Sequence, residues 1–113
     1  MSDTRLTDRH CQSETNQLDS TAVQALMAEI HADWSLSEDG QMIQRIFRFK
    51  NYYQTIAFVN ALAWVAHQQD HHPDLEVGYN RCVVHYSTHS VGGLSENDFI
   101  CAAGIDALVP GDA

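Results

Sequence analysis

The hydrophobic residues of this 113-residue chain switch repeatedly between helical and strand spacing. Residues 20–33, 53–69 and 95–108 follow a helical period, whereas 34–49 and 75–88 alternate or form short strand-like runs. Alternation is typical of strands that bury one face. The order helix, strand, strand, helix, strand, strand, helix predicts an α+β fold, with a four-stranded antiparallel sheet and helices packed on one face.

Residues with strong local preferences mark the ends of these segments. The cap, turn and break signals are Ser20 or Thr21, Ser37–Gly40, Pro73, Gly78–Asn80, Gly92–Gly93, Ser95 and Pro110–Gly111. Proline disfavours helical backbone in the residue before it. We therefore expect the second helix to end near Gln69 and His72 to lie just beyond that end.

The alternation also predicts which side chains are buried. In the second strand the expected core face is Ile43, Arg45, Phe47 and Phe49. In the last strand Cys82, Val84, Tyr86 and Thr88 lie opposite Val83, His85, Ser87 and His89. The aromatic residues expected in the core are Phe47, Phe49, Phe58, Trp64 and Tyr86, whereas Trp34 can line a pocket.

Composition narrows the class of protein. With 44% hydrophobic and 19% charged residues the chain is an ordinary globular protein, long enough for one domain. We expect a flexible polar leader over residues 1–19 and a single domain over residues 20–113. A formal charge of -9 disfavours binding to nucleic acid or anionic lipid. Neither a signal peptide nor a long apolar run occurs, so the expected location is cytoplasmic.

The three cysteines, Cys11, Cys82 and Cys101, are widely separated and form no CxxC pair. Such an odd, scattered set predicts neither a disulfide framework nor a thiolate zinc site. We expect reduced thiols, two of them in the core.

Histidines are concentrated in Asp70-His71-His72-Pro73 and in Ser87-Thr88-His89. The acidic cap segment Leu94–Asp98 follows them. Because imidazole titrates at about pH 6.5, several imidazoles gathered by a short fold can both donate and accept protons at neutral pH. The pattern predicts proton-transfer chemistry.

Each of these residues also has a structural interpretation. His71 and His72 can stabilise the negative end of a helix, and His89 can be a loop residue. Asp98 can occupy the N3 position of a capping box that begins at Ser95. Capping and catalysis are compatible, because a carboxylate there can also orient an imidazole and favour its protonated form. The histidines assigned to surface or structural roles are His10, His31 and His85.

A metal site is disfavoured. His67 and His71 share one helix surface at i and i+4, a spacing that zinc sites use. The zinc-protease pattern HExxH needs Glu at the next position, however, and residue 68 is Gln. No cysteine or carboxylate at a suitable spacing completes a ligand set.

The histidine segments belong to a longer series that resembles the signature of the pterin-4a-carbinolamine dehydratase family. The series is Asp70-His71-His72-Pro73, Tyr79, Ser87-Thr88-His89, Gly93-Leu94-Ser95 and Asp98. Trp34 and the Phe47-Arg48-Phe49 strand are similar to the family pattern as well, so the resemblance spans about residues 20–108. Relatives often carry an acid at the position of His67.

The resemblance implies a lyase that removes water from a 4a-hydroxytetrahydropterin, such as 4a-hydroxytetrahydrobiopterin, and gives a quinonoid dihydropterin in tetrahydrobiopterin recycling. The site residues it implies are catalytic His71, His72 and His89, orienting Asp98, and pterin contacts at Pro73, Ser87, Thr88 and Trp34. We expect His71 and His89 to be the general acid and base, in either order, and His72 to orient the pterin. The resemblance also implies a homodimer or homotetramer and neither a metal nor an organic cofactor.

An alternative function belongs to a different class. Relatives of this family also act as dimerisation partners of a homeodomain transcription factor or as assembly factors, and such a module needs little or no catalysis. The presence of His71, His72 and His89 favours an active enzyme over this alternative.

Overall fold

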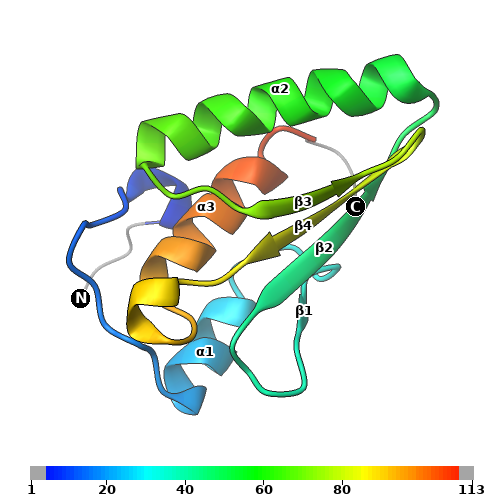
Figure 1. Ribbon diagram of the computed structural model, residues 1–113. Helices are drawn as coiled ribbons and strands as arrows, with labels where there is room; N and C mark the ends of the chain where they lie inside the picture. The colour runs from blue at the N-terminus through cyan, green and yellow to red at the C-terminus, as the bar shows by residue number, and fades with distance from the viewer. Residues whose placement is uncertain (1–4, 110–113) are drawn as a thin grey trace.

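The alternating periods of the sequence correspond to three α-helices and four β-strands within residues 5–109, the part of the chain that the computed structural model describes. Along the chain the elements are η1 (Leu6–Asp8), α1 (Ser20–Met27), β1 (Ser35–Leu36), β2 (Ile43–Arg48), α2 (Tyr52–Gln69), β3 (Asp74–Val77), β4 (Arg81–Tyr86), η2 (His89–Val91) and α3 (Glu96–Asp106) (Figure 1). The predicted α+β fold is confirmed. The break predicted at residues 110–111 lies outside the described residues.

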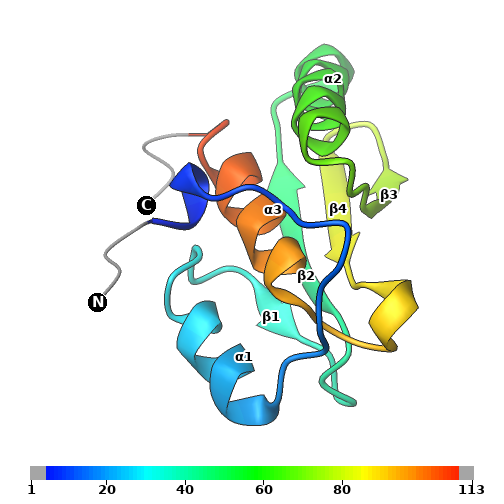
Figure 2. The same cartoon turned by 90° about the vertical axis from the view of Figure 1, so that its left-hand side faces the viewer.

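The strands form one antiparallel sheet in the order β1-β2-β4-β3. In the β2–β4 register, Arg45 lies opposite Val84 and Phe47 lies opposite Cys82, and all four side chains are buried. The side chains of residues that lie opposite each other on neighbouring strands point to the same side of the sheet, so these four residues form one continuous buried face. The helices lie on this side of the sheet (Figures 1 and 2).

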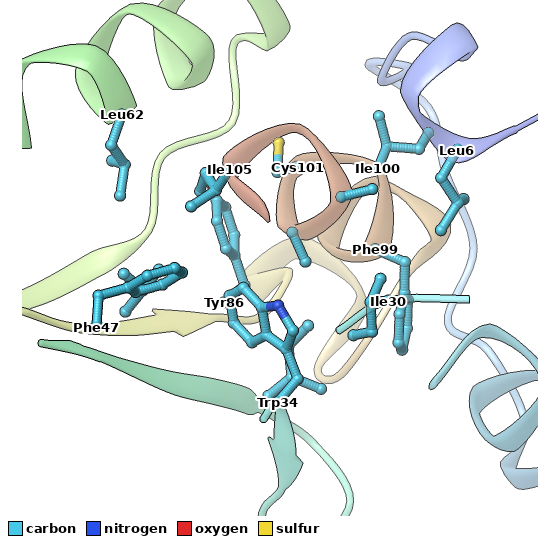
Figure 3. Close-up of a cluster of buried hydrophobic side chains, with 14 of the residues drawn as sticks. Leu6, Ile30, Trp34, Phe47, Leu62, Tyr86, Phe99, Ile100, Cys101 and Ile105 are labelled. Atoms are coloured by element: carbon cyan, nitrogen blue, oxygen red, sulfur yellow. The ribbon is translucent and has the colours of Figure 1, made fainter. Parts of the chain in front are cut away.

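The core fills the space between that face and the helices. Phe47 packs on Phe58 of α2 with ring centroids 4.6 Å apart and meets Trp34 edge-on. Figure 3 shows α3 contributing Phe99, Ile100 and other side chains to the same cluster. Each such side chain contributes about 1.5–3 kcal/mol by its removal from water, so α3 is fixed firmly against the sheet.

The end of α2 sets the direction of the chain that follows it. Asp70 adopts a left-handed backbone (φ 51°) and caps the helix through its N–H. The N–H of His71 bonds the carbonyl of Ala66 at 3.1 Å, which is the pattern of a helix C-terminal cap. The chain then passes Pro73 and begins β3, so His71 and His72 lie in the connection, as predicted.

The N-terminal segment, residues 5–19, differs from the expected flexible leader of little structural weight. Leu6 is buried in the core, and the segment runs along α3 in both views (Figures 1 and 2). The Cys11 N–H donates to Gln69 Oε1 at 2.7 Å, and the Leu18 N–H donates to the Leu94 carbonyl at 2.8 Å. Hydrophobic periodicity reports only the local spacing of residues along the chain. It therefore could not indicate hydrogen bonds between residues that are far apart in the sequence.

Two further expectations were wrong. The first helix ends at Met27 rather than near residues 31–33, although Ile30 is still buried. Trp64 is 60% exposed on α2, because the buried stripe of that helix is Thr55, Phe58, Leu62 and Ala66. Within the described residues, no helix has the length and apolar character needed to cross a membrane.

Candidate active site

His71 and Asp98 form the central contact of the site. His71 Nε2 lies 2.6 Å from Asp98 Oδ1, although the residues are separated by 27 positions in the chain. The Asp98 side chain is completely buried, and the His71 side chain is 16% exposed. A carboxylate that is buried in this way requires hydrogen bonds or a cation to offset its lost hydration.

Two groups besides His71 meet that requirement around Asp98. Its Oδ2 accepts hydrogen bonds from the Thr88 hydroxyl at 2.8 Å and from the Ser95 N–H at 2.9 Å. The Thr88 and Ser95 hydroxyls also bond each other at 2.7 Å. Ser95 and Asp98 form the predicted capping box at the start of α3, where the helix dipole favours negative charge. Asp98 therefore caps a helix and holds an imidazole at the same time.

The electrostatics of this pair favour a protonated imidazole. Burial lowers the pKa of His71, but the hydrogen bond to Asp98 and the charge of Asp98 outweigh it, so the pKa lies above its ordinary value. Because Asp98 takes Nε2–H, the other ring nitrogen, Nδ1, is the one that can exchange a proton with a ligand.

The predicted histidines surround one small cavity of about 220 Å³. Its lining consists of Asp70, His71, His72, Asp74, His85, Ser87, Thr88, His89 and Ser90. The connection after α2 supplies His71 and His72, and the chain after β4 supplies His89 at the start of η2. Imidazoles from two separated segments thus face a single space, as the sequence predicted.

A second hollow of about 320 Å³ shares Ser87, Thr88 and His89 with this cavity. Its other wall includes residues of the β1–β2 connection, among them Asp39 and Met42. Hydrogen bonds lower the pKa of Asp39. The largest effect comes from the Ser37 hydroxyl and the next largest from the backbone N–H of Gln41. The connection is therefore ordered by its own hydrogen bonds beside the histidine cavity.

His85 lines the cavity, although the sequence predicts a surface or structural role for it. Its Nε2 lies 2.6 Å from Glu76 Oε2 on the neighbouring strand β3. Its Nδ1 is buried and has no hydrogen-bond partner within residues 5–109. The alternation of β4 already placed His85 on one face with Ser87 and His89, and that signal could have identified it.

Trp34 and Pro73 do not take the positions expected of pterin contacts. Trp34 is 3% exposed in the core, and its indole N–H donates to Asp106 Oδ1 at 2.8 Å. Pro73 is not among the residues that line the cavity, and its carbonyl lies 3.1 Å from His72 Nδ1. Trp34 therefore supports the core, and Pro73 shapes the connection that carries His72.

No group of three or more His, Cys, Asp or Glu side chains within residues 5–109 is arranged to hold a metal ion. His67, the possible partner of His71 on one helix surface, packs against Trp64 instead, with ring centroids 5.6 Å apart and ring planes tilted by 38°.

Comparison with known proteins places this site in a family. The family model of pterin 4 alpha carbinolamine dehydratase matches residues 16–108, which include every histidine of the cavity. The chain belongs to the pterin-4a-carbinolamine dehydratase family. A Legionella pneumophila (strain Paris) relative named as a pterin-4-alpha-carbinolamine dehydratase is 50% identical over 107 residues, which cover 92% of this chain and 95% of the relative. One from Stenotrophomonas maltophilia (strain R551-3) is 72% identical over 75 residues, 66% of this chain and 65% of its own.

Solved structures of the family share the fold. A transcriptional coactivator/pterin dehydratase from Brucella melitensis superposes with a TM-score of 0.78 at 29% identity, covering 82% of this chain and 98% of that one. A pterin dehydratase-like protein identified as a RuBisCO assembly factor in the alpha-carboxysome superposes with a TM-score of 0.60 at 28% identity, covering 71% and 93% of the two chains. The dehydratase fold therefore occurs in proteins described by different activities.

Proposed function

We propose that this protein is a hydro-lyase that removes water from 4a-hydroxytetrahydropterins and produces quinonoid dihydropterins. The observation that carries the proposal is the His71–Asp98 pair beside His72 and His89 around one cavity. The substrate class comes from the family to which the chain belongs. Recycling of tetrahydrobiopterin is the physiological task that this reaction would serve.

The reaction needs one acid and one base. Hydroxide is a poor leaving group, so an acid must protonate the 4a oxygen as the carbon–oxygen bond breaks. The ring nitrogens supply the electrons, and a base removes a ring N–H proton. The sum is one water and one quinonoid dihydropterin for each substrate, with no change of oxidation state and no net transfer of protons to the enzyme.

We assign the acid to His71 and the base to His89. Asp98 favours the imidazolium form of His71, which is the form that can donate through Nδ1. His89 lies on the other segment and lines both hollows, so it can act on a different part of the ring. His72 orients the pterin, and Ser87 offers a hydroxyl to it. Thr88 supports Asp98 rather than touching substrate.

The test is the rate of 4a-hydroxytetrahydropterin dehydration with and without purified protein, with the uncatalysed loss of water subtracted. His71→Ala and His89→Ala should each lower kcat on the order of 10²-fold or more. His72→Ala should lose activity mainly through KM. His10→Ala is the matched control, because His10 is exposed and does not line the cavity. Rates close to wild type in all three cavity variants would refute the assignment.

We also propose that the protein works as a homodimer or homotetramer in the cytoplasm. Two large aromatic side chains on α2, Tyr53 and Trp64, are 81% and 60% exposed, and such surface favours burial against another copy. Light scattering coupled to size exclusion gives the mass directly. A monomer at micromolar concentration would contradict the proposal, and Trp64→Lys should weaken any assembly that buries this face.

A second candidate is a protein-interaction module with little catalysis. The observation that favours it is that one similar structure is described as a coactivator and another as an assembly factor. A stoichiometric protein partner recovered in a pulldown, together with no catalysed dehydration, would reverse our ranking. Catalysis that depends on His71 and His89 would keep the enzyme ranked above the interaction module.

A further inference from the structure

Two cysteines from distant parts of the chain are in contact. Cys11 Sγ lies 3.6 Å from Cys101 Sγ, although 90 positions separate the residues. Cys11 belongs to the N-terminal segment, and Cys101 projects from the middle of α3 (Figure 3). The third cysteine, Cys82, is buried on β4 as a free thiol.

The pair lies directly behind the site. Cys101 Sγ is 3.7 Å from the carbonyl of His71, which also accepts a hydrogen bond from the Tyr86 hydroxyl at 3.0 Å. Cys101 follows Asp98 by three residues on α3, so the two side chains lie on the same surface of the helix. Cys11 Sγ lies 3.5 Å from the Asn97 carbonyl.

The two thiols differ in character. A hydrogen bond from Cys11 lowers the pKa of Cys101, and Tyr86 and His71 lower it further, although burial opposes them. The same contact with Cys101, together with burial, raises the pKa of Cys11. Either sulfur can be the donor in this contact, and we assign the attacking role to Cys101 and the proton-donating role to Cys11. Burial alone raises the pKa of Cys82 to about 11, which leaves that thiol unreactive.

We propose that Cys11 and Cys101 form a reversible intramolecular disulfide when a small peroxide reaches them. The Cys101 thiol releases its proton to solvent, its sulfur attacks one peroxide oxygen, the O–O bond breaks, and the leaving hydroxide takes the Cys11 proton to become water. The Cys11 sulfur then attacks the sulfenic acid at Cys101, the S–O bond breaks, and the displaced hydroxide takes up the proton that Cys101 released and leaves as a second water. Two thiols lose two electrons and one hydrogen peroxide is reduced to two waters.

The N-terminal segment controls access to the pair. Cys11 is half-buried, whereas Cys101 is fully buried beneath it. Hydrogen bonds hold the segment to α2 and α3, among them those of Cys11 with Gln69 and of Gln12 with Asn97. Local opening of this peripheral segment, without global unfolding, would admit a small oxidant to Cys101.

Oxidation would tie the N-terminal segment to α3 and stabilise the fold. The bond would close a loop of about 90 residues, and disulfides that close long loops restrict the unfolded chain most. We expect Tm to rise by roughly 5–15 °C on oxidation and to return on reduction with dithiothreitol. His71 keeps its bond from Tyr86, so catalysis should change by less than about threefold.

The experiment is peroxide treatment of the reduced full chain followed by mass spectrometry. Digestion after Arg and Glu separates Cys82 from Cys101, because Glu96 lies between them. A loss of about 2 Da and a single peptide pair joining Cys11 to Cys101 support the proposal. Cys11→Ser and Cys101→Ser should abolish both the cross-link and the Tm rise, whereas Cys82→Ser, the matched control, should keep both.

Several outcomes would overturn the proposal. They are free thiols at Cys11 and Cys101 after treatment, a cross-link that joins two chains, a cross-link to Cys82, or an oxidised protein whose Tm does not rise. None of these measurements uses a pterin, so the inference and the proposed dehydratase activity fail or succeed separately.

Discussion

The two ends of α3 carry aspartates that are chemically identical and placed for different tasks. Asp98, in the first turn, is held by Thr88, Ser95 and a favourable helix dipole, and its second oxygen contacts His71. Asp106, the last residue of the helix, lies where the dipole disfavours negative charge. It pairs with buried Arg45 at 2.6 Å.

The partners explain the difference. Around Asp106 the cation is a guanidinium, which never loses its charge at ordinary pH, and the Trp34 indole and the His31 N–H complete the set. Around Asp98 the partner is an imidazole at a cavity wall, which can gain or lose a proton. We therefore assign a structural role to the carboxylate beside the permanent cation, and we propose that the carboxylate beside the titratable imidazole serves proton transfer.

The largest expected effect is on stability, at the Asp106 end. Asp106→Ala should lower the free energy of unfolding by about 3–5 kcal/mol, because it removes a carboxylate that pairs with the buried Arg45. Denaturant unfolding measures the change. Asp8→Ala, at an exposed aspartate of the N-terminal segment, should change it by less than about 0.5 kcal/mol. Folded Asp106→Ala at low temperature should retain its kcat, and a specific loss of kcat there would break the comparison.

Asp98→Asn should act on catalysis instead. The amide can still occupy the space of the carboxylate, but it no longer favours the protonated form of His71. We expect kcat to fall on the order of 10²-fold, which corresponds to about 2.7 kcal/mol in the barrier. Single-turnover rates measured on folded protein separate this loss from instability. An Asp98→Asn enzyme with wild-type kcat would remove Asp98 from the mechanism.

The sequence predicted the helices and strands better than the distant residues that their side chains contact. Alternation in the second strand placed Arg45 on the buried face, because side chains of a strand point to opposite sides in turn. It could not supply Asp106, which lies 61 positions away. Trp64 was misplaced because α2 carries apolar residues on several sides, and spacing alone does not show which side faces the sheet.

In the candidate site, too, the sequence predicted local patterns but not contacts between distant residues. The capping box at Ser95 and Asp98 was predictable because its members are three residues apart. The family resemblance implied that Asp98 orients an imidazole without indicating which one, since no local pattern relates a helix C-terminus to a distant helix N-terminus. His85 was overlooked because it belongs to no motif, although its strand position was correct.

The dependence of stability on pH should distinguish the His71–Asp98 pair from the Arg45–Asp106 pair. His71 has a raised pKa in the folded protein, so its stabilising contribution is fully present below the unfolded value of about 6.5. It is lost as the pH rises through the folded value. The stability lost in His71→Gln relative to wild type should therefore be larger at pH 6 than at pH 9. Asp106→Ala should cost the same at both pH values, because Arg45 stays charged.

The smallest effect should come from Thr88, whose hydroxyl supports Asp98 and which our proposal makes neither the acid nor the base of the reaction. Thr88→Val removes one hydrogen bond to Asp98 Oδ2 with little change in shape, a loss of about 1 kcal/mol. That loss should appear as a severalfold decrease in kcat with KM unchanged, and Thr88→Ser should restore the rate. Ser87→Ala, next to it on the cavity wall, should raise KM instead. If Thr88→Val also acts through KM, Thr88 is a pterin contact, and the network around Asp98 is less isolated from substrate than its geometry indicates.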